Sequence, residues 1–215
     1  MAKTGAAPTS SSDETEITLG LLSAVEENSA VTQRSVAQEL GIALGLANAY
    51  LKRCVKKGLI KVKQIPPNRY AYYLTPQGFA EKTRLTGEYL SASFTFFRRA
   101  RGQCEAIFAR CAEREWRRIA LVGAGDLAEI ATLCAREYGI ELVGIVASAD
   151  AGDRFAGLPV AADLDALGPF DAVLVTEMQA PQAAVDALEG RVAPERILAP
   201  ALLRVSRRDG AEAAS

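Results

Sequence analysis

The chain has 215 residues, of which 49% are apolar, and its formal net charge is −1. A chain of this length can bury one sizeable hydrophobic core or two small ones. Its apolar runs are shorter than a membrane span of about 18 residues, and residues 1–16 lack the apolar segment of a signal peptide. We therefore expect a cytoplasmic protein without a membrane segment.

Charge is distributed unevenly along the chain. Residues 31–118 carry 17 Lys and Arg but only 6 Asp and Glu, a net charge of +11, whereas the remaining residues carry a net charge of −12. A basic segment of this density favours a polyanion such as nucleic acid, because each neutralised phosphate releases counterions. The near-neutral total thus combines a basic part and an acidic part, and this uneven distribution favours two small domains with different partners.

The cysteines show no CxxC spacing and the chain has no histidine, so the sequence predicts no zinc or other metal site. In a reducing compartment we interpret all four as small core side chains: Cys54, Cys104, Cys111 and Cys134. Cys104 and Cys111 lie seven residues apart on one helical face, which leaves a thiol sensor as the less favoured alternative.

Two short helices are predicted at the start of the chain. Apolar residues recur at helical spacing from Ile17 to Val25, before Asn28. A second helix follows Thr32, whose side chain can cap the amides of the first turn, and ends at Gly41.

A third helix is predicted for ALGLANAYLKRCVKKG, residues 43–58. Ala47, Leu51 and Val55 form its apolar back, with Tyr50 and Cys54 beside them. Two helices joined by a tight glycine turn, the second with a polar and basic front, are what a major-groove reader requires. The residues of that front are Gly45, Asn48, Ala49, Lys52, Arg53 and Lys56.

Two strands are predicted next, LIKVKQI and YAYYLT, around the turn PPNR. They would form a wing beside the third helix, with Lys61, Lys63 and Arg69 along the phosphate backbone. The alternative is a small helical and hairpin domain with a merely solvated basic face.

Residues 21–86 resemble the winged helix-turn-helix of MarR-type regulators, especially the branch associated with exopolysaccharide gene clusters. The shared pattern is LG…LG..N..L…..KG, followed by LTP.G. The resemblance implies that Asn48 and Lys52 face the groove and that Arg69 lies at the tip of the wing.

A long helix is predicted from the cap and first-turn pair Thr75 and Pro76 to about Glu115. Its apolar residues alternate by four and three, which is typical of a coiled-coil seam and favours a two-fold dimer. The alternative is that the same stripe packs on the second domain of its own chain. We also consider a break near Gly102 that would act as a hinge. The predicted seam comprises Leu90, Phe94, Phe97, Arg101, Cys104, Phe108 and Cys111.

The stretch RIALVGAGDLAE, residues 118–129, indicates a strand, a glycine turn and a helix that continues to about Tyr138. Gly123, Gly125 and Ala128 have the G-x-G-x-x-A spacing, in which the second glycine lets a pyrophosphate approach the backbone and the small third residue lets helix and strand pack closely. The helix would direct its amide-rich end at the phosphate.

Strands and helices alternate after the glycine turn, which predicts a parallel sheet covered on both faces. The expected elements are strands at 141–147 and 158–163, a helix near Leu164, a strand at 171–177, a helix at 181–189 and a last strand at 196–200.

This segment resembles the small Rossmann-like modules of CoA-binding proteins and of nucleotide-sugar-modifying enzymes. Where such modules carry an acidic residue at the end of the second strand, this chain has Ala147, so the carboxylate that holds a ribose hydroxyl is missing. Asp150 or Asp153 could replace it from the loop. The resulting candidate ligand contacts are Gly123, Ala124, Gly125, Asp126, Leu127, Ser148, Asp150 and Thr176, with Glu177 as a further candidate.

We therefore expect an α/β protein, and a DNA-binding transcription regulator rather than an enzyme, since no catalytic set is recognisable. Its partners would be double-stranded DNA, a second copy of the chain and an effector such as a nucleotide sugar, CoA or NAD(H). Control of polysaccharide genes is implied by the resemblance alone. The expected segments are a tail (1–15), a winged helix-turn-helix (16–76), a linking and dimerisation helix (77–116), a Rossmann-like domain (117–206) and a second tail (207–215).

Three other interpretations stay open. Rex-like repressors also join a winged helix to an NADH-sensing Rossmann domain, but this chain lacks the ribose-binding acid. A nucleotide-sugar-modifying enzyme would need a general base, and the sequence shows no candidate in a known motif. A degenerate Rossmann fold would serve protein contacts alone.

Overall fold

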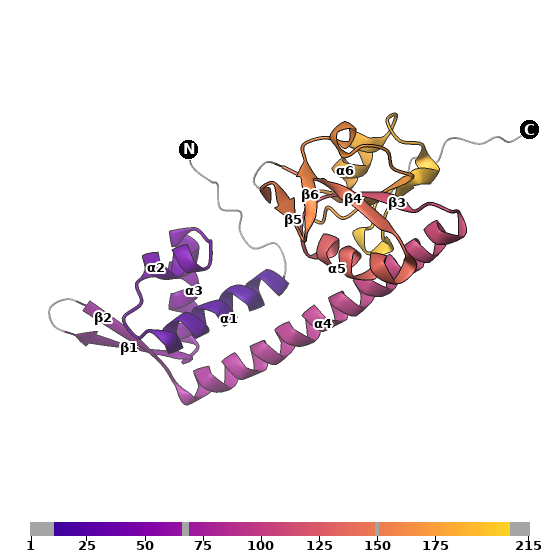
Figure 1. Ribbon diagram of the computed structural model, residues 1–215. Coiled ribbons are helices and arrows are strands. Elements are labelled where there is room, and N and C mark those ends of the chain that lie inside the picture. Colours follow the sequence, from indigo (N-terminus) through magenta and orange to yellow (C-terminus); the bar gives the residue numbers. More distant parts are fainter. Residues whose placement is uncertain (1–10, 66–68, 149–150, 207–215) are drawn as a thin grey trace, which may run out of the picture. The chain divides into compact units, whose positions relative to one another are not determined.

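The computed structural model describes residues 11–65, 69–148 and 151–206, with the backbone alone for residues 11–13, 65 and 69. The chain divides into two compact units, residues 1–94 and 95–215, and each has its own hydrophobic core. Helix α4 (Pro76–Glu113) continues from the first unit into the second (Figure 1). No described helix is long and apolar enough to cross a membrane.

Three helices precede the hairpin in the first unit, as predicted: α1 (Ser11–Glu27), α2 (Gln33–Glu39) and α3 (Leu44–Lys56). Helix α1 begins inside the segment 1–15 that the sequence had assigned to a tail. The Thr32 hydroxyl accepts a hydrogen bond from the Ser35 amide and caps α2, which confirms the predicted cap. Gly41 ends the helix at a φ of 62°, a conformation that glycine adopts without strain.

The core of the first unit lies between α1, α3 and an antiparallel hairpin, β1 (Ile60–Ile65) and β2 (Arg69–Leu74). Tyr72 donates its amide to the Ser29 carbonyl at 2.8 Å, which ties the hairpin to the loop after α1. The prediction for Val55 was wrong: its side chain is 36% exposed, whereas Tyr50 and Cys54 are buried. Tyr50 and Cys54 face the core together with Ala47 and Leu51, so Val55 lies at the edge of the buried face.

The hairpin leads into α4 through a short, tightly packed junction. The Thr75 hydroxyl accepts a hydrogen bond from the Gly78 amide and donates one to the Gly58 carbonyl. A Cβ atom at position 78 would lie 2.1 Å from the Leu59 carbonyl oxygen, so this position accepts only glycine. The LTPQG segment is therefore explained by packing: threonine caps the helix, and glycine lets the start of β1 lie against its first turn.

Helix α4 runs to Glu113 without a break at Gly102, so the predicted hinge there was wrong. The predicted seam is divided between two environments. Cys104, Phe108 and Cys111 are buried in the core of the second unit, which is the alternative that the sequence left open. Leu90 and Phe94 stay exposed.

The second unit is built on a six-stranded sheet with the order β5-β6-β4-β3-β7-β8. Five strands are parallel, and β5 pairs antiparallel with β6 at the edge, which the sequence did not predict. The strands are β3 (Arg118–Val122), β4 (Glu141–Val146), β5 (Arg154–Phe155), β6 (Leu158–Ala161), β7 (Ala172–Val175) and β8 (Ile197–Leu198).

The two crossover helices are α5 (Asp126–Ala135) and α6 (Pro181–Leu188). From the central β3 the chain passes through α5 to β4, toward one edge of the sheet. From β7 it passes through α6 to β8, at the other edge. Right-handed crossovers then place α5 and α6 on opposite faces (Figure 1). The strand order reverses between β3 and β7, and sheets of this kind bind ligands outside the carboxyl ends of the strands at that point.

Short 3-10 helices complete the second unit: η1 (Arg136–Tyr138) extends α5, η3 (Leu164–Leu167) lies where a helix was expected near Leu164, η4 (Pro194–Arg196) precedes β8, and η5 (Ala201–Leu203) follows it. The second half of α4 packs beside α5, where the Cys134 thiol donates to the Arg101 carbonyl at 3.9 Å. It also holds the last described segment, because the Gln103 side chain accepts the Leu202 amide at 2.8 Å.

Candidate nucleic-acid interface and glycine turn

The polar front of α3 is exposed where the sequence predicted it. Gly45, Ala49, Lys52 and Lys56 are all exposed, opposite the buried back of the helix. The two small residues lie toward the start of the helix and the two lysines toward its end. Such a surface lets the helix backbone approach base edges closely while the lysines reach phosphates.

Asn48 and Arg53 lie at the borders of that front and are less available than predicted. Asn48 is half-buried, and its Oδ1 atom is buried without a hydrogen-bond partner. The Arg53 guanidinium lies 3.4 Å from the Glu14 carboxylate of α1 and 5.0 Å from the centre of the Tyr50 ring. Arg53 therefore ties α3 to α1 in addition to any contact with a ligand.

The hairpin adds two further lysines to the basic surface. Lys61 and Lys63 alternate with Ile60 and Val62 along β1, so they lie on the face opposite the one that carries buried Ile60 and Tyr72. Both lysines are exposed. Arg69 begins β2, but its side chain lies outside the described residues, as does the turn at 66–68.

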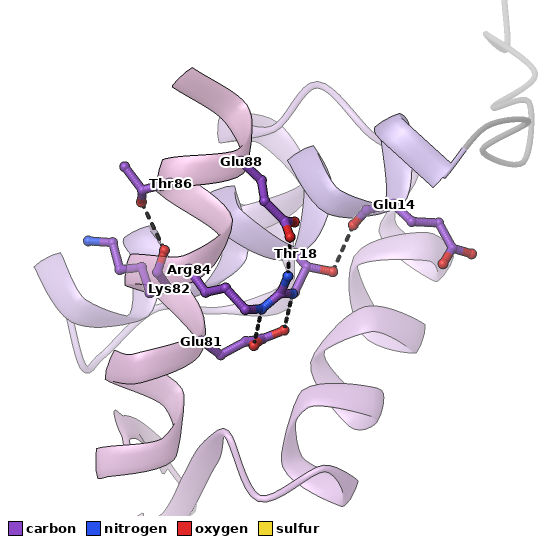
Figure 2. Close-up of polar contacts among 7 residues, drawn as sticks. All are labelled: Glu14, Thr18, Glu81, Lys82, Arg84, Thr86 and Glu88. Carbon is purple, nitrogen blue, oxygen red and sulfur yellow. Dashed lines mark hydrogen bonds and ion pairs between the residues drawn. The ribbon is translucent and has the colours of Figure 1, made fainter. Parts of the chain in front are cut away.

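Two cations on the first-unit part of α4 are neutralised by carboxylates. Figure 2 shows Arg84 between Glu81 and Glu88 on α4: its Nε and Nη2 atoms each lie 2.8 Å from a Glu81 oxygen, and Nη1 donates to Glu88. The hydrogen bonds to Glu81 and Glu88 raise the pKa of Arg84. Lys82 forms an ion pair with Glu26 of α1.

By contrast, Lys57 is exposed without an ion-pair partner among the described residues, and so are four lysines of α3 and β1. They are Lys52, Lys56, Lys61 and Lys63, and we call them the lysine surface. Most exposed cations of the first unit that lack a carboxylate partner in the described chain thus lie on α3 and β1, the two elements that the sequence assigned to DNA, and Arg34 of α2 is a further one.

The first glycine of the turn after β3 is required by packing. Gly123 has a φ of 106°, and a Cβ atom there would lie 2.4 Å from the Glu177 backbone. The segment after β7 therefore crosses directly over position 123. Ala128, the small third residue of the motif, is fully buried, as close helix–strand packing requires.

The second glycine has no such structural reason. Gly125 has an extended backbone, with a φ of 168°, and a Cβ atom at this position would meet nothing within 4 Å. It precedes the first residue of α5, so open space lies beside the amide-rich start of a helix. Glycine at this position is what close approach of a ligand to the backbone would require.

Other candidate ligand residues serve the fold. Leu127 is fully buried, so it can offer a ligand only its amide. Thr176 is 2% exposed and its hydroxyl donates to the Gly123 carbonyl at 2.6 Å, so it holds the glycine turn against β7 instead of facing a ligand. Glu177 accepts the Gln179 amide at 2.6 Å ahead of α6. No pattern in the sequence pointed to these two backbone contacts.

The remaining candidates lie around the turn and at the end of β4. Ala124 is half-buried, and Asp126 is exposed in the first turn of α5, where a carboxylate interacts favourably with the helix dipole. Ser148 is exposed just after Ala147, while Asp150 lies outside the described residues. Asp153 is exposed.

Another carboxylate near these strand ends, Asp163 after β6, is occupied. Arg191 donates to both of its oxygens, at 2.6 and 2.9 Å, and lowers the pKa of Asp163 to about 2. Asp163 therefore does not supply the carboxylate that Ala147 lacks.

The four cysteines are buried and unpaired. Burial raises the pKa of the Cys104 thiol to about 12 and that of Cys111 to about 11, so both stay protonated at neutral pH. A protonated, buried thiol reacts slowly, which supports their interpretation as core side chains.

Residues 14–61 match the family model for winged helix-turn-helix DNA-binding domains. No curated protein is significantly similar to the chain in sequence. Among solved structures, a Listeria innocua protein of unknown function is 20% identical, over 38% of this chain and 58% of its own, with a TM-score of 0.32. MepR, a transcription regulator of the Staphylococcus aureus multidrug efflux pump MepA, is 24% identical, over 39% of this chain and 62% of its own, with a TM-score of 0.33.

Human N-acetylserotonin methyltransferase aligns over 87% of this chain and 62% of its own, with 13% identity and a TM-score of 0.23. None of these likenesses extends the family match beyond residues 14–61. The matched segment covers most of α1, all of α2 and α3, and the start of β1. The first unit of the chain thus contains a winged helix-turn-helix DNA-binding domain.

Proposed function

We propose that the protein is a MarR-type transcription regulator, not an enzyme, that binds double-stranded DNA through the lysine surface and responds to a nucleotide-type effector at the glycine turn. The observation that carries the DNA-binding part is the contrast in charge compensation. The lysine surface has no carboxylate partners in the described chain, whereas Lys82 and Arg84 are both paired with glutamates.

The arrangement of α3 and the hairpin supports this assignment. A helix whose front carries Gly45 and Ala49 can enter the major groove without steric hindrance, and Lys52 and Lys56 extend from the same front. Lys61 and Lys63 add phosphate contacts from the hairpin. Phosphate contacts position the protein, and the base edges next to α3 supply the specificity.

The effector part rests on the second unit, which we assign to the Rossmann-like domains. The strand order places the glycine turn and the end of β7 at the point where the order reverses. The open space at Gly125 and the start of α5 suit a pyrophosphate. We favour a sugar nucleotide over NADH, because Ala147 stands where a carboxylate would hold the ribose.

A second copy of the chain is the third proposed partner. Leu90, Phe94 and Phe97 are 46%, 60% and 37% exposed, and they follow one another at helical spacing on α4. Adjacent exposed apolar side chains of this size mark an interaction surface. Cys104, Phe108 and Cys111 of the predicted seam are buried in their own chain, and Arg101 is paired with Glu105 and Glu137, so we place the dimer contact on these three apolar residues.

The DNA-binding surface is tested by removing its charge. Replacing Lys61 and Lys63 with glutamine should reduce the slope of log affinity against log salt by about 0.9 per lost phosphate contact. Fluorescence anisotropy with a labelled duplex at several salt concentrations measures this slope. The matched control replaces Lys82 and Arg84 with glutamine, which removes the same charge and should leave the slope unchanged. Equal slopes in the wild type and the Lys61/Lys63 variant would contradict the assignment.

The dimer contact is tested by placing charged side chains at exposed apolar positions of α4. Leu90→Glu with Phe94→Glu should convert a dimer into a folded monomer, because the two side chains lie outside both cores of the chain. Sedimentation equilibrium measures the mass, and circular dichroism verifies the fold. A wild-type monomer at micromolar concentration, or a variant that still forms dimers, would show that these residues do not hold two copies together.

The glycine turn is tested by ligand-dependent thermal stability. One of UDP-glucose, GDP-mannose, CoA or NADH should raise the melting temperature of the wild type. Gly125→Val should melt near the wild-type temperature without ligand but lose the rise, because the side chain enters the open space. Gly123→Ala should melt several degrees lower, since its Cβ meets the Glu177 backbone. If no nucleotide stabilises the wild type, the turn is a packing feature and the domain serves protein contacts.

A further inference from the structure

The second unit contains a cavity that the glycine turn does not line. Its volume is about 330 Å³, and it opens beside the segment that follows β7. This volume lies at the lower end of the range for small-molecule sites, so the cavity suits a compact ligand. The lining residues come from α4, the loop before α6, the start of α6 and η5, and they are Thr95, Phe96, Arg99, Met178, Pro181, Leu202 and Leu203.

Most of the wall is apolar. Phe96 and Leu202 are half-buried, Leu203 is buried, and Met178 is 43% exposed at the mouth. Aliphatic and aromatic walls of this kind bind hydrocarbon, and a methionine at the opening can adapt its side chain to different ligands. An occupant would therefore present an apolar body to this wall.

The polar part of the cavity is positive. The Arg99 guanidinium has no carboxylate partner among the described residues, whereas nearby Arg101 lies 2.6 Å from Glu105 and 2.9 Å from Glu137. Pro181 is the first residue of α6, and the Glu177 carboxylate accepts the amides of Gln179 and Ala180 just ahead of it, at 2.6 and 3.3 Å. The start of α6 thus has an anionic partner within the chain, and the positive charge that the cavity offers to a ligand is that of the exposed Arg99 side chain.

Hydrogen bonds hold the wall in position. The Gln103 side chain of α4 accepts the Leu202 amide at 2.8 Å. Gln182 of α6 binds both the amide and the carbonyl of Ser206, at 2.8 and 3.0 Å. The segment that supplies Leu202 and Leu203 is therefore fastened to α4 and α6, and a ligand would meet a largely preformed site.

We propose that this cavity binds a small amphipathic anion, namely an aliphatic carboxylate of medium chain length. The alkyl chain lies against Phe96, Met178 and Leu203, and the carboxylate pairs with Arg99. The site is separate from the nucleotide site proposed at Gly125, and the chain would thus bind two ligands of different chemistry on one domain.

Isothermal titration calorimetry of the full chain with octanoate tests the proposal, with octylamine as the probe of opposite charge. We expect octanoate to bind and octylamine not to bind. Arg99→Gln should weaken octanoate binding about tenfold, because it removes a charged hydrogen-bond partner. Met178→Trp should reduce it further by filling the mouth. Arg98→Gln removes a neighbouring cation that does not line the cavity, and it should bind octanoate as the wild type does.

Three results would overturn the proposal: no binding of octanoate to the wild type, equal binding of octylamine, or unchanged binding in both the Arg99 and Met178 variants. Gly125→Val should bind octanoate normally. This variant therefore separates the cavity from the glycine turn, because loss of the nucleotide response leaves the octanoate result unaffected. Circular dichroism of each variant verifies that the fold is retained.

Discussion

The structure depends on one helix whose side chains belong to two hydrophobic cores. Leu85 of α4 is buried in the core of the first unit, while Ala100, Cys104 and Phe108 of the same helix are buried in the core of the second. Between Leu85 and Ala100, every described side chain is exposed or half-buried. Phe96 of this middle stretch packs against the core of the second unit, whereas Leu90, Phe94 and Phe97 stay exposed and form the surface that we propose for a second chain.

The two units also differ in which of their charged side chains are paired. In the first unit, cations on α4 are paired with glutamates, and free positive charge remains on α3 and β1, where a duplex would bind. In the second unit, Asp163 and Arg191 compensate each other, and Arg99 is a cation without such a partner in the described chain. The uncompensated charge on α3 and β1, and that of Arg99 at the cavity, is where we propose that each unit meets a charged ligand.

Local signals in the sequence predicted local structure well. Thr32, Gly41 and the Thr75–Pro76 pair mark helix ends because caps and left-handed turns depend on nearby residues. Alternation of strands and helices likewise predicted the parallel sheet. Helical periodicity could not tell what covers a stripe, so Phe108 and Phe94 were assigned to one seam although only Phe108 is buried. The hydroxyl of Thr176 and the cavity at Arg99 depend on segments that are distant in sequence, and no spacing rule reveals them.

The central claim is that α4 is one uninterrupted helix shared by two cores. Native-state hydrogen exchange of the amides from Tyr89 to Arg99 tests it most directly, because this stretch has little burial to protect it other than helical hydrogen bonds and a partner chain. The account predicts that these amides exchange much more slowly than those of an unstructured peptide, with no gap at Phe94 and Thr95. Exchange at the unstructured rate across these residues would contradict it and indicate a flexible linker.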